Sequence, residues 1–251
     1  MIIAEEIDFM SEKLNPKYKR VLLKLSGEAI SGKIDEKGNK NIIDHELLGT
    51  ICEKIKTCRE MGVQVSIVVG AGNIWRGRQG TDMDSVRADH MGMLATVINA
   101  IAIRDALERA GVPAAVMTAV EMNAFAEQFT RDGAIKNLED GKVIVFGCGT
   151  GNPFFSTDTG AVLRAAEIEA DVILLAKNVD GVYDKDPGKN PDAKKLDSIT
   201  YTDILAKELK VIDATAASLA RDKGMKMLVF GLNDPENIIR AMCEDIGTVV
   251  G

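Results

Sequence analysis

Aromatic residues and excess positive charge are both scarce in this sequence of 251 residues. Phe, Trp and Tyr together make up 4% of the chain, and Trp75 is its one tryptophan. Proteins that bind single-stranded nucleic acid usually stack bases on several aromatic side chains, so the composition disfavours that class. The formal net charge of −7 also argues against a general attraction for nucleic acid or for an anionic membrane. We therefore expect neither as a partner, and a polyanionic ligand would need a few local cations, backbone N–H groups and a metal ion.

Cysteine and histidine are few as well. The four cysteines include no Cys-x-x-Cys pair, and His45 and His90 are the two histidines. This composition argues against a structural zinc site and against a disulfide framework. Cys52 and Cys58 fall within an apolar helical pattern, so we expect them to be small buried hydrophobic residues.

Long apolar runs are absent from the sequence. None reaches the ~18 residues that a membrane-spanning helix needs. The segment from Met1 to Lys17 is acidic and mixed, and lacks the basic and then apolar order of a signal peptide. We expect residues 1–17 to be an N-terminal extension. Residues 18–251 are expected to form a single domain, because no Pro-rich or Ser-rich linker interrupts them.

What the sequence does contain is an alternation of β-rich runs with helical repeats of apolar residues. Runs typical of strands lie at 20–25, 63–69, 114–118, 142–147, 171–176 and 227–230. The long helix expected at 85–110 has an apolar face formed by Met91, Leu94, Ile98 and Ile101. Strands that alternate with helices predict an α/β fold, here a three-layer αβα sandwich around a mainly parallel central sheet. Ligands of such sheets bind at the carboxyl ends of the strands, so the turns that follow the strands are the candidate sites.

Two of these turns contain groups that can bind phosphate. The first strand ends in KLSG at 24–27, where Lys24 can meet phosphate oxygens and the next residues can present backbone N–H groups. It is not a P-loop, since G-x-x-x-x-G-K-[ST] occurs nowhere in the chain. The second strand is followed by small residues at 70–72, which allow close approach of a phosphate, and by Arg76, which can bind it bidentately. Taken alone, a solvated lysine and an ordinary glycine turn remain open as alternatives.

The most distinctive segment reads GCGTGNPFFSTDT from Gly147 to Thr159. It leads into a helix expected from about Thr157 through Ile168, whose N-terminus adds free N–H groups and a positive dipole end. Polar side chains that can read a base edge or bond a phosphate are Thr150, Asn152, Ser156 and Thr157. Phe154 and Phe155 are expected by default to pack in the core. For Asp158, plain helix capping and a role beside a metal or a lysine both remain open.

The loop from Lys177 to Pro187 and the start of the long helix supply further candidates. In the loop, Tyr183 could lie against an adenine ring and Asp186 could accept a hydrogen bond from ribose or base, with a plain surface loop as the alternative. In the helix, Asp89 could accept the two hydroxyls of a ribose. No general base is required if the phosphoryl acceptor is itself an ionised phosphate.

Taken together, these segments resemble the bacterial UMP kinases of the amino acid kinase superfamily. The matching text lies in the same order from Tyr18 to about Asp222 and includes YKRVLLKLSGEA, VVGAGNIWRG, DHMGMLATVINA, GTGNPFFSTDT and EIEADVILLAKNVDGVYDKDP. The resemblance implies conversion of UMP and ATP to UDP and ADP in pyrimidine nucleotide biosynthesis, with Mg²⁺ held through the nucleotide phosphates. It also implies a cytoplasmic homohexamer with GTP as activator and UTP as inhibitor.

The resemblance assigns roles by position. The implied catalytic residues are Lys24, Arg76, Asp158 and Asp213. Those implied in ATP binding are Lys24, Leu25, Ser26, Gly27, Gly72, Arg76, Lys177, Asn178, Tyr183 and Asp186. Those implied in UMP binding are Ala71, Asp89, Thr150, Gly151, Asn152, Pro153, Phe154, Phe155, Ser156 and Thr157. No metal ligand from the protein itself is implied.

Some features depart from the family, and other functions share the fold. The family usually has glycine where Ala71 stands, and the segment from Ser31 to Asn41 differs from the glycine-rich loop linked to GTP activation. One alternative is a related enzyme that phosphorylates a carboxylate or carbamate, against which GTGNPFFSTDT argues. The other is a catalytically silent nucleotide-binding module for sensing or storage. The presence of Lys24, Asp158 and Asp213 argues against that second alternative.

Overall fold

The computed structural model of the chain describes residues 15–33, 38, 41–76 and 82–251. Most of the expected N-terminal extension at 1–17, and part of the segment from Ser31 to Asn41, lie outside the described residues. Where the description begins, the backbone N–H of Lys17 donates to the carbonyl of Met242 at 2.8 Å, and its ammonium pairs with Asp245 at 2.5 Å. The end of the expected extension is therefore fastened to the C-terminal part of the chain.

One sheet of nine strands forms the centre of the molecule, in the order β4-β3-β5-β2-β1-β6-β10-β11-β9. Their bounds are β1 Arg20–Leu25, β2 Gln64–Val69, β3 Ala114–Thr118, β4 Glu127–Gln128, β5 Val143–Gly147, β6 Val172–Lys177, β9 Ser198–Ile199, β10 Met227–Gly231 and β11 Thr248–Val250. Neighbouring strands run parallel except for β10 and β11. Two short strands, β7 Val182–Tyr183 and β8 Lys195–Leu196, form a separate antiparallel ribbon. The predicted, mainly parallel central sheet is confirmed.

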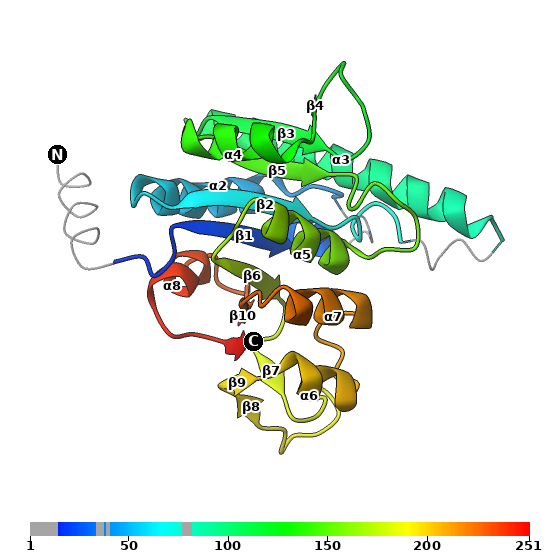
Figure 1. Cartoon of the computed structure of the whole chain (residues 1–251), viewed down its shortest axis with the longest axis vertical. Coiled ribbons are helices and arrows are strands. Elements are labelled where there is room, and N and C mark those ends of the chain that lie inside the picture. Colours follow the sequence, from blue (N-terminus) through cyan, green and yellow to red (C-terminus); the bar gives the residue numbers. More distant parts are fainter. Residues whose placement is uncertain (1–14, 34–37, 39–40, 77–81) are drawn as a thin grey trace.

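Helices cover both faces of this sheet, as Figure 1 shows. One face carries α2 His45–Glu60, α3 Ser85–Arg109 and α8 Asn237–Cys243. The other carries α4 Arg131–Glu139, α5 Thr157–Glu167, α6 Tyr201–Ala206 and α7 Ala214–Asp222. Along β1, Leu23 points into the first core and Leu22 into the second, because successive strand residues face opposite sides. Burial on both faces explains the continuous apolar runs of the strands, and the predicted three-layer sandwich is confirmed.

The apolar face predicted for α3 lies on the outside of the chain. Its residues are 40–52% exposed: Met91, Leu94, Ile98 and Ile101. A different face packs on the sheet, through Ala100, Ile103, Ala106 and Leu107. The helix is therefore apolar on two sides, of which one is covered within this chain.

The connections between the strands create a crevice at the carboxyl ends of β1 and β6, in the middle of the sheet. From β1 the chain passes through α2 to β2 on one side, whereas from β6 it continues to β10 on the other. A sheet whose connections diverge between two neighbouring parallel strands opens a crevice at their carboxyl ends. Lys24 near the end of β1 and Lys177 at the end of β6 lie beside this crevice.

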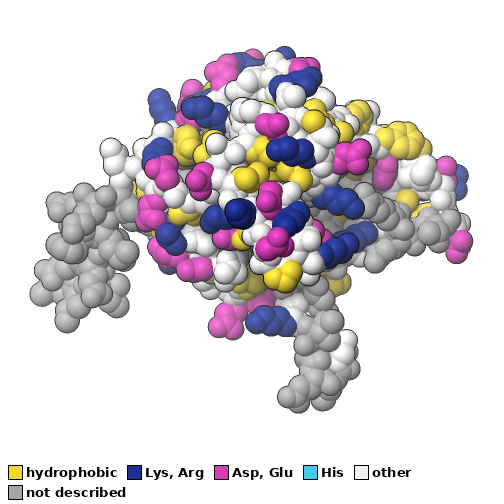
Figure 2. Space-filling view, turned by 90° about the horizontal axis from the view of Figure 1, so that it is seen from below, with side chains coloured by type: hydrophobic (Ala, Val, Ile, Leu, Met, Phe, Trp, Pro, Cys, Tyr) yellow, Lys and Arg dark blue, Asp and Glu magenta, His cyan; other side chains and the backbone are white. Residues whose placement is uncertain are grey.

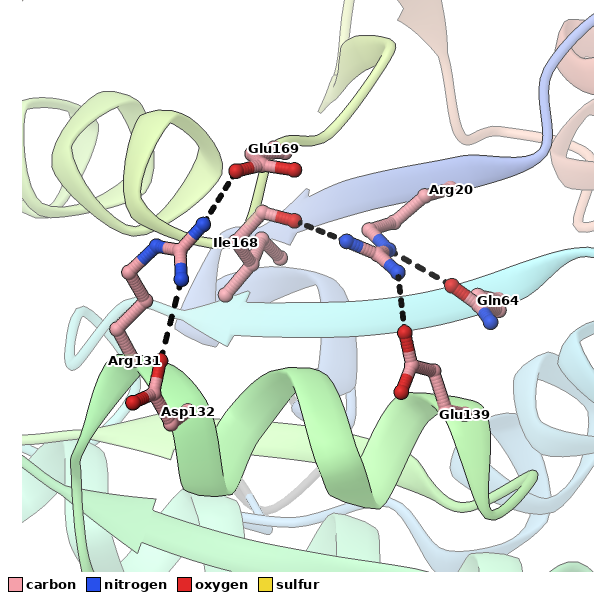
Figure 3. A network of polar contacts seen from close by, with 7 residues as sticks. All are labelled: Arg20, Gln64, Arg131, Asp132, Glu139, Ile168 and Glu169. Carbon is pink, nitrogen blue, oxygen red and sulfur yellow. Dashed lines mark hydrogen bonds and ion pairs between the residues drawn. The ribbon is translucent and has the colours of Figure 1, made fainter.

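A polar network around two arginines, Arg20 at the amino end of β1 and Arg131 at the start of α4, joins several elements (Figure 3). Arg20 donates from Nε to Oε1 of Gln64 at 2.7 Å and from Nη1 to the carbonyl of Ile168 at 2.6 Å. Its guanidinium also lies 3.9 Å from Glu139 at the end of α4. Arg131 forms ion pairs with two acidic side chains beside it. Both arginines are thus engaged in contacts that join separate elements of the fold.

The surface around the small ribbon carries charge of both signs. Figure 2, seen from the end that contains α6 and the β7–β8 ribbon, shows Lys and Arg interspersed with Asp and Glu on that face. Ion pairs such as Lys185 with Asp192 and Lys195 with Asp180, at 2.6 and 3.0 Å, contribute to this mixture. Across the described part of the chain, none of the helices has the length and apolar character needed to cross a membrane.

Candidate active site

A buried cluster of two lysines and one aspartate lies at the carboxyl edge of the sheet. Nζ of Lys24, on β1, is 2.7 Å from Oδ1 of Asp158 in the first turn of α5. Nζ of Lys177, at the end of β6, is 3.6 Å from the other carboxylate oxygen. Of the two roles left open for Asp158 by the sequence, the structure supports that of a lysine partner, since Ser156 is the residue that caps α5.

Burial and charge act in opposite directions on this cluster. Burial by itself raises the pKa of Asp158, but the charges of Lys24 and Lys177 outweigh it and hold that pKa below its ordinary value. Burial lowers the pKa of Lys177, although Asp158 opposes this change. Asp158 is therefore ionised at neutral pH and lies between the side chains of the two lysines. The cluster carries a net positive charge, which suits it to binding an anion and leaves Asp158 poorly suited to act as a base.

Next to this cluster, two backbone turns touch each other. Ser26 caps a short 3₁₀ helix, η1 Gly27–Ile30, and its hydroxyl accepts a hydrogen bond from the backbone N–H of Ala29 at 3.2 Å. A Cβ atom at Gly27 would lie 2.8 Å from both the carbonyl oxygen of Gly70 and the N atom of Gly72. No side chain fits at this position, so glycine allows the turn after β1 to pack directly on the turn after β2.

The turn after β2 forms part of the wall of a first cavity of about 340 Å³. Residues predicted from sequence that line this cavity are Ala71, Gly72, Arg76, Asp89, Thr150, Asn152, Phe155, Ser156 and Thr157. Gly72 and Arg76, expected to bind ATP, thus line a cavity together with residues expected to bind UMP, while Gly72 also lies against Gly27 of the turn after β1. The guanidinium of Arg76 forms an ion pair with Glu28 of η1, which sequence reasoning did not single out.

The segment between β5 and α5 reaches this cavity in an unusual conformation. Its backbone φ angles are positive at Cys148, Gly149, Gly151 and Phe154, with values between 54° and 87°. Such angles are costly for residues other than glycine. The N–H of Phe154 donates to Oδ2 of Asp89 on α3 at 2.7 Å, and the N–H of Cys148 donates to Oγ1 of Thr96 at 2.9 Å. The long helix therefore holds the segment from both ends.

The default expectation that Phe154 and Phe155 pack in the core is wrong. Their side chains are 72% and 51% exposed. The positive φ of Phe154, together with the hydrogen bond of its N–H to Asp89, turns the chain at the rim of the cavity. Phe155 contributes to the cavity wall, whereas Phe154 does not.

The N-termini of α5 and α7 meet at Asp213. Its carboxylate caps α7 by accepting the N–H of Ala216 at 3.0 Å. The same carboxylate accepts hydrogen bonds from the hydroxyls of Ser156, the residue that caps α5, and of Thr159, the latter at 3.2 Å. Two positive helix ends thus lie beside the lysine cluster, where they favour an anion. Asp213 itself is fully engaged in holding these helices together.

A second cavity, of about 500 Å³, lies on the side of the β7–β8 ribbon. Predicted residues that line it are Lys177, Tyr183 and Asp186. The hydroxyl of Tyr183 donates to Asp180 at 2.7 Å, which fixes its ring on the wall. The wall also includes Leu209, Lys210 and Val211, which sequence reasoning missed; the signal available was their position just before Asp213.

Some predicted residues lie outside both cavity walls. Gly151, Pro153 and Phe154 belong to the segment around the first cavity but do not line it, and Asn178 lines neither cavity. The side chain of Leu25 is fully buried, and its carbonyl accepts the N–H of Gly70 at 2.9 Å. Lys24 and Asp158 line neither cavity, but Lys177, which pairs with Asp158, lines the second, and Thr157, which precedes Asp158, lines the first.

Comparison with known proteins gives consistent matches over almost the whole chain. Residues 19–231 match the family model described as Amino acid kinase family. The solved structure of a UMP kinase from Bacillus anthracis is 38% identical, with a TM-score of 0.87, over 93% of this chain and 96% of that one. A UMP kinase from Ureaplasma parvum is 37% identical, with a TM-score of 0.85, over 94% of this chain and 99% of that one.

A more distant solved structure has the same architecture. The uridylate kinase from Archaeoglobus fulgidus is 27% identical, with a TM-score of 0.68, over 92% of this chain and 99% of that one. The resemblance drawn from the sequence motifs is confirmed by these matches. With a family model that spans most of its length and bacterial structures that align along nearly all of it, this chain belongs to the amino acid kinase family.

Proposed function

We propose that this chain is a UMP kinase, which transfers the γ-phosphoryl group of ATP to the phosphate of UMP and releases UDP and ADP. One observation carries the proposal: the cluster of Lys24, Asp158 and Lys177 lies at the carboxyl ends of the strands, where Lys177 lines one cavity and Thr157, next to Asp158 in the chain, lines the other. A kinase for a nucleotide acceptor needs two nucleotide sites with cations between them. The similarity to the UMP kinases from Bacillus anthracis and Ureaplasma parvum supports UMP as the acceptor.

The first cavity is assigned to UMP. Asp89 offers carboxylate oxygens for ribose hydroxyls, while Thr150 and Asn152 offer groups for the base edge. The UMP phosphate then points towards Arg76 and the N-terminus of α5, which provide a planar cation and free N–H groups. Ala71 stands on the same wall, so its methyl group reduces the space next to the backbone of the turn.

The second cavity is assigned to the adenosine part of ATP. Tyr183 presents an aromatic ring there, and Asp186 presents a carboxylate whose Oδ1 accepts the N–H of Gly188 at 2.9 Å. The ATP phosphates extend from this cavity towards Lys177, Lys24 and the turn at 26–27. Ser26 and Gly27 act there through their backbone.

The transfer requires positioning and charge neutralisation more than proton removal. The second pKa of a phosphate monoester is about 6, so the UMP phosphate is already a nucleophile at neutral pH. One of its oxygens forms a bond to the γ-phosphorus, and the bond from that phosphorus to the β–γ bridging oxygen breaks. Lys24 and Lys177 compensate the negative charge of the transferring group, while Asp158 holds the two ammonium groups in place.

The residues of this chain fit a magnesium ion that arrives with the nucleotide, not one held by the protein alone. In the described residues, no group of three or more His, Cys, Asp or Glu side chains could ligate a metal. Asp213 already accepts hydrogen bonds within the protein, and Asp158 forms ion pairs with Lys24 and Lys177, although its buried Oδ1 accepts no hydrogen bond from the described residues. Magnesium bound through the phosphates would supply additional charge compensation there.

The proposal extends to assembly, regulation and location. The exposed apolar face of α3 supports a surface covered by a second copy of the chain, as in the homohexamer that the sequence resemblance implies. Activation by GTP and inhibition by UTP belong to the proposal on the same resemblance, as do a cytoplasmic location and a role in pyrimidine nucleotide biosynthesis. Domain organisation, with residues 18–251 as one domain, is proposed likewise.

The deciding experiment is a coupled assay of phosphoryl transfer with ATP and magnesium. UMP is compared with CMP, an N-acyl amino acid carboxylate and carbamate as acceptors, each with and without GTP and UTP. We expect UDP formation from UMP, and the Lys24→Ala variant excludes a contaminating kinase. Binding of UMP and ATP with no UDP formed would instead indicate a silent nucleotide-binding module. Transfer to the carboxylate or carbamate would indicate a different acceptor.

A further inference from the structure

Two asparagine side chains form a reciprocal amide pair behind the turn that follows β2. Asn99, on the inner face of α3, is fully buried, and Asn73 belongs to the turn. Nδ2 of Asn99 donates to Oδ1 of Asn73 at 2.8 Å, and Nδ2 of Asn73 donates to Oδ1 of Asn99 at 2.9 Å. A polar side chain that is buried so completely is costly unless all its hydrogen bonds are made.

The remaining donors of the pair reach the backbone of two other segments. The second N–H of Asn99 donates to the carbonyl of Gly70 at 2.8 Å, and the second N–H of Asn73 donates to the carbonyl of Ile42 at 2.8 Å. All four amide N–H groups are thus used. Reversing either amide would place nitrogen against nitrogen and oxygen against a carbonyl, so the network has one arrangement.

These bonds act at the contact between the two turns of the site. The carbonyl oxygen of Gly70 lies against Gly27, and a Cβ atom at Gly27 would also collide with Oδ1 of Asn73. On the other side of the same turn, Ala71 and Gly72 line the first cavity. The amide pair therefore supports a backbone segment that touches both the proposed ATP phosphate turn and the proposed UMP cavity.

We infer that Asn73 and Asn99 are positioning residues that set the spacing between the two phosphates before transfer. The inference rests on the proposed function. Neither side chain lines either cavity, so both act through the backbone of the turn at 70–72. Ile42 directly follows the segment from Ser31 to Asn41. The hydrogen bond from Asn73 to its carbonyl therefore also joins Ile42 to the turn after β2.

The test compares Asn99→Leu with Ser66→Ala. Leucine is close to asparagine in size and removes every hydrogen bond of Asn99. Ser66→Ala also removes a buried side-chain bond to a backbone carbonyl, that of Val21 at 3.0 Å, but within the sheet and away from its carboxyl edge. Turnover is measured per folded molecule at a temperature where each variant is folded, with UMP and ATP varied separately.

We expect kcat of Asn99→Leu to fall by ~10- to 100-fold, since small misplacements of reacting groups have effects of this order. The KM values should change less, because the walls of the two cavities keep their own side chains. Ser66→Ala should lower Tm and leave kcat unchanged. A kcat for Asn99→Leu within twofold of the wild type would overturn the inference, as would an equal loss of kcat in Ser66→Ala.

A second variant and a second measurement keep the test decisive. If Asn99→Leu does not fold, Asn73→Ala takes its place, because Asn73 is only half-buried; a smaller loss of kcat in the same direction is expected. Amide hydrogen exchange at residues 70–76, without substrates, should be faster in either asparagine variant than in Ser66→Ala. If the wild type forms no UDP, the proposed function fails. Hydrogen exchange still tests the positioning role by itself: equal rates at residues 70–76 in the asparagine variants and in Ser66→Ala would overturn it.

Discussion

The ammonium of Lys24 lies 2.7 Å from a carboxylate oxygen of Asp158, although one residue comes from the first strand and the other from α5. Their side chains are 9% and 16% exposed, so little water screens the pair. The same carboxylate holds Lys177 at 3.6 Å. One acidic side chain therefore sets the separation of the two cations on which the proposed transfer depends.

Replacing Lys24 with alanine should lower turnover far more than UMP affinity. We expect kcat to fall by ~10²-fold or more, as for the loss of one preorganised charge-stabilising donor. The KM for UMP should change little, because Lys24 does not line the first cavity. Steady-state UDP formation measures both quantities. Lys54→Ala is the control, since it removes a lysine that pairs with Glu236 at 2.6 Å between α2 and the start of α8 and should leave turnover unchanged. Near-wild-type turnover in Lys24→Ala would contradict the assignment.

Asp158→Asn should destabilise the protein in a pH-dependent manner. The pKa of Asp158 is lower in the folded than in the unfolded chain, so its stabilisation is present above ~3.9 and is lost as pH falls through the folded value. At pH 7 the variant leaves two buried ammonium groups without their counter-charge. We expect the free energy of unfolding to drop by ~3–5 kcal/mol, with the difference from wild type shrinking below about pH 4.

Urea unfolding between pH 7 and 3 measures this dependence. Asp140→Asn is the matched control: its carboxylate pairs with Lys136 at 2.6 Å on the surface of α4 and is half exposed. Surface pairs of this kind contribute little to stability, so little change is expected. A destabilisation by Asp158→Asn that stays constant from pH 7 to 3 would be incompatible with the ion pair as its cause.

Gly27→Ala should separate the two turns of the site. The new Cβ atom would lie 2.8 Å from two backbone atoms of the turn after β2, and these cannot move independently of that turn. We expect a loss of ~1–3 kcal/mol in stability together with a large loss of turnover. Gly49→Ala in α2, with open space around its Cβ, should instead stabilise by up to ~1 kcal/mol. Thermal unfolding and UDP formation test both; wild-type behaviour of Gly27→Ala would show that the turns are not in contact.

Leu94→Glu should disrupt the proposed assembly through α3. A carboxylate in the middle of the exposed apolar face would be buried without a partner on association. We expect sedimentation velocity to show a multimer for the wild type and a smaller species for the variant. Val249→Glu, at a comparably exposed apolar residue on β11, should leave the mass unchanged. An unchanged mass in Leu94→Glu, or a wild type that is a monomer, would rule out this face as the interface.

Much of the fold was predictable because its signals are local. The strands β1, β2, β3, β5, β6 and β10 are mainly apolar runs, and their bounds differ from the predicted ones by at most one residue at either end. The strands of two or three residues, such as β4 and β9, have too few residues to show any periodicity, and their pairing is set by neighbouring strands. For α3, the apolar periodicity was correctly predicted, but periodicity does not tell which of two apolar faces meets the sheet.

The sequence predicted which segments form the candidate site, but not which residues of those segments contact one another. Turns after parallel strands meet at one edge, so the KLSG turn at 24–27 and the loop after β6 could be expected there together. The hydrogen bonds of Asp213 and the reciprocal pair of Asn73 and Asn99 could not be expected, since their partners are distant in sequence. From the sequence alone, Asp213 would be interpreted as an ordinary helix cap and Asn99 as an ordinary helix residue.

The layered α/β architecture, the segments that carry the chemistry and the family resemblance follow from the amino-acid sequence alone, because periodicity, turn residues and motifs are encoded within short stretches of chain. How these stretches are used depends on the three-dimensional packing. It turned Phe154 outwards, placed Arg76 on the wall of the first cavity, and set Asp158 between two lysines. The physical reason is that charge pairing and burial depend on which distant residues become neighbours, and this follows from the packing of the whole sheet.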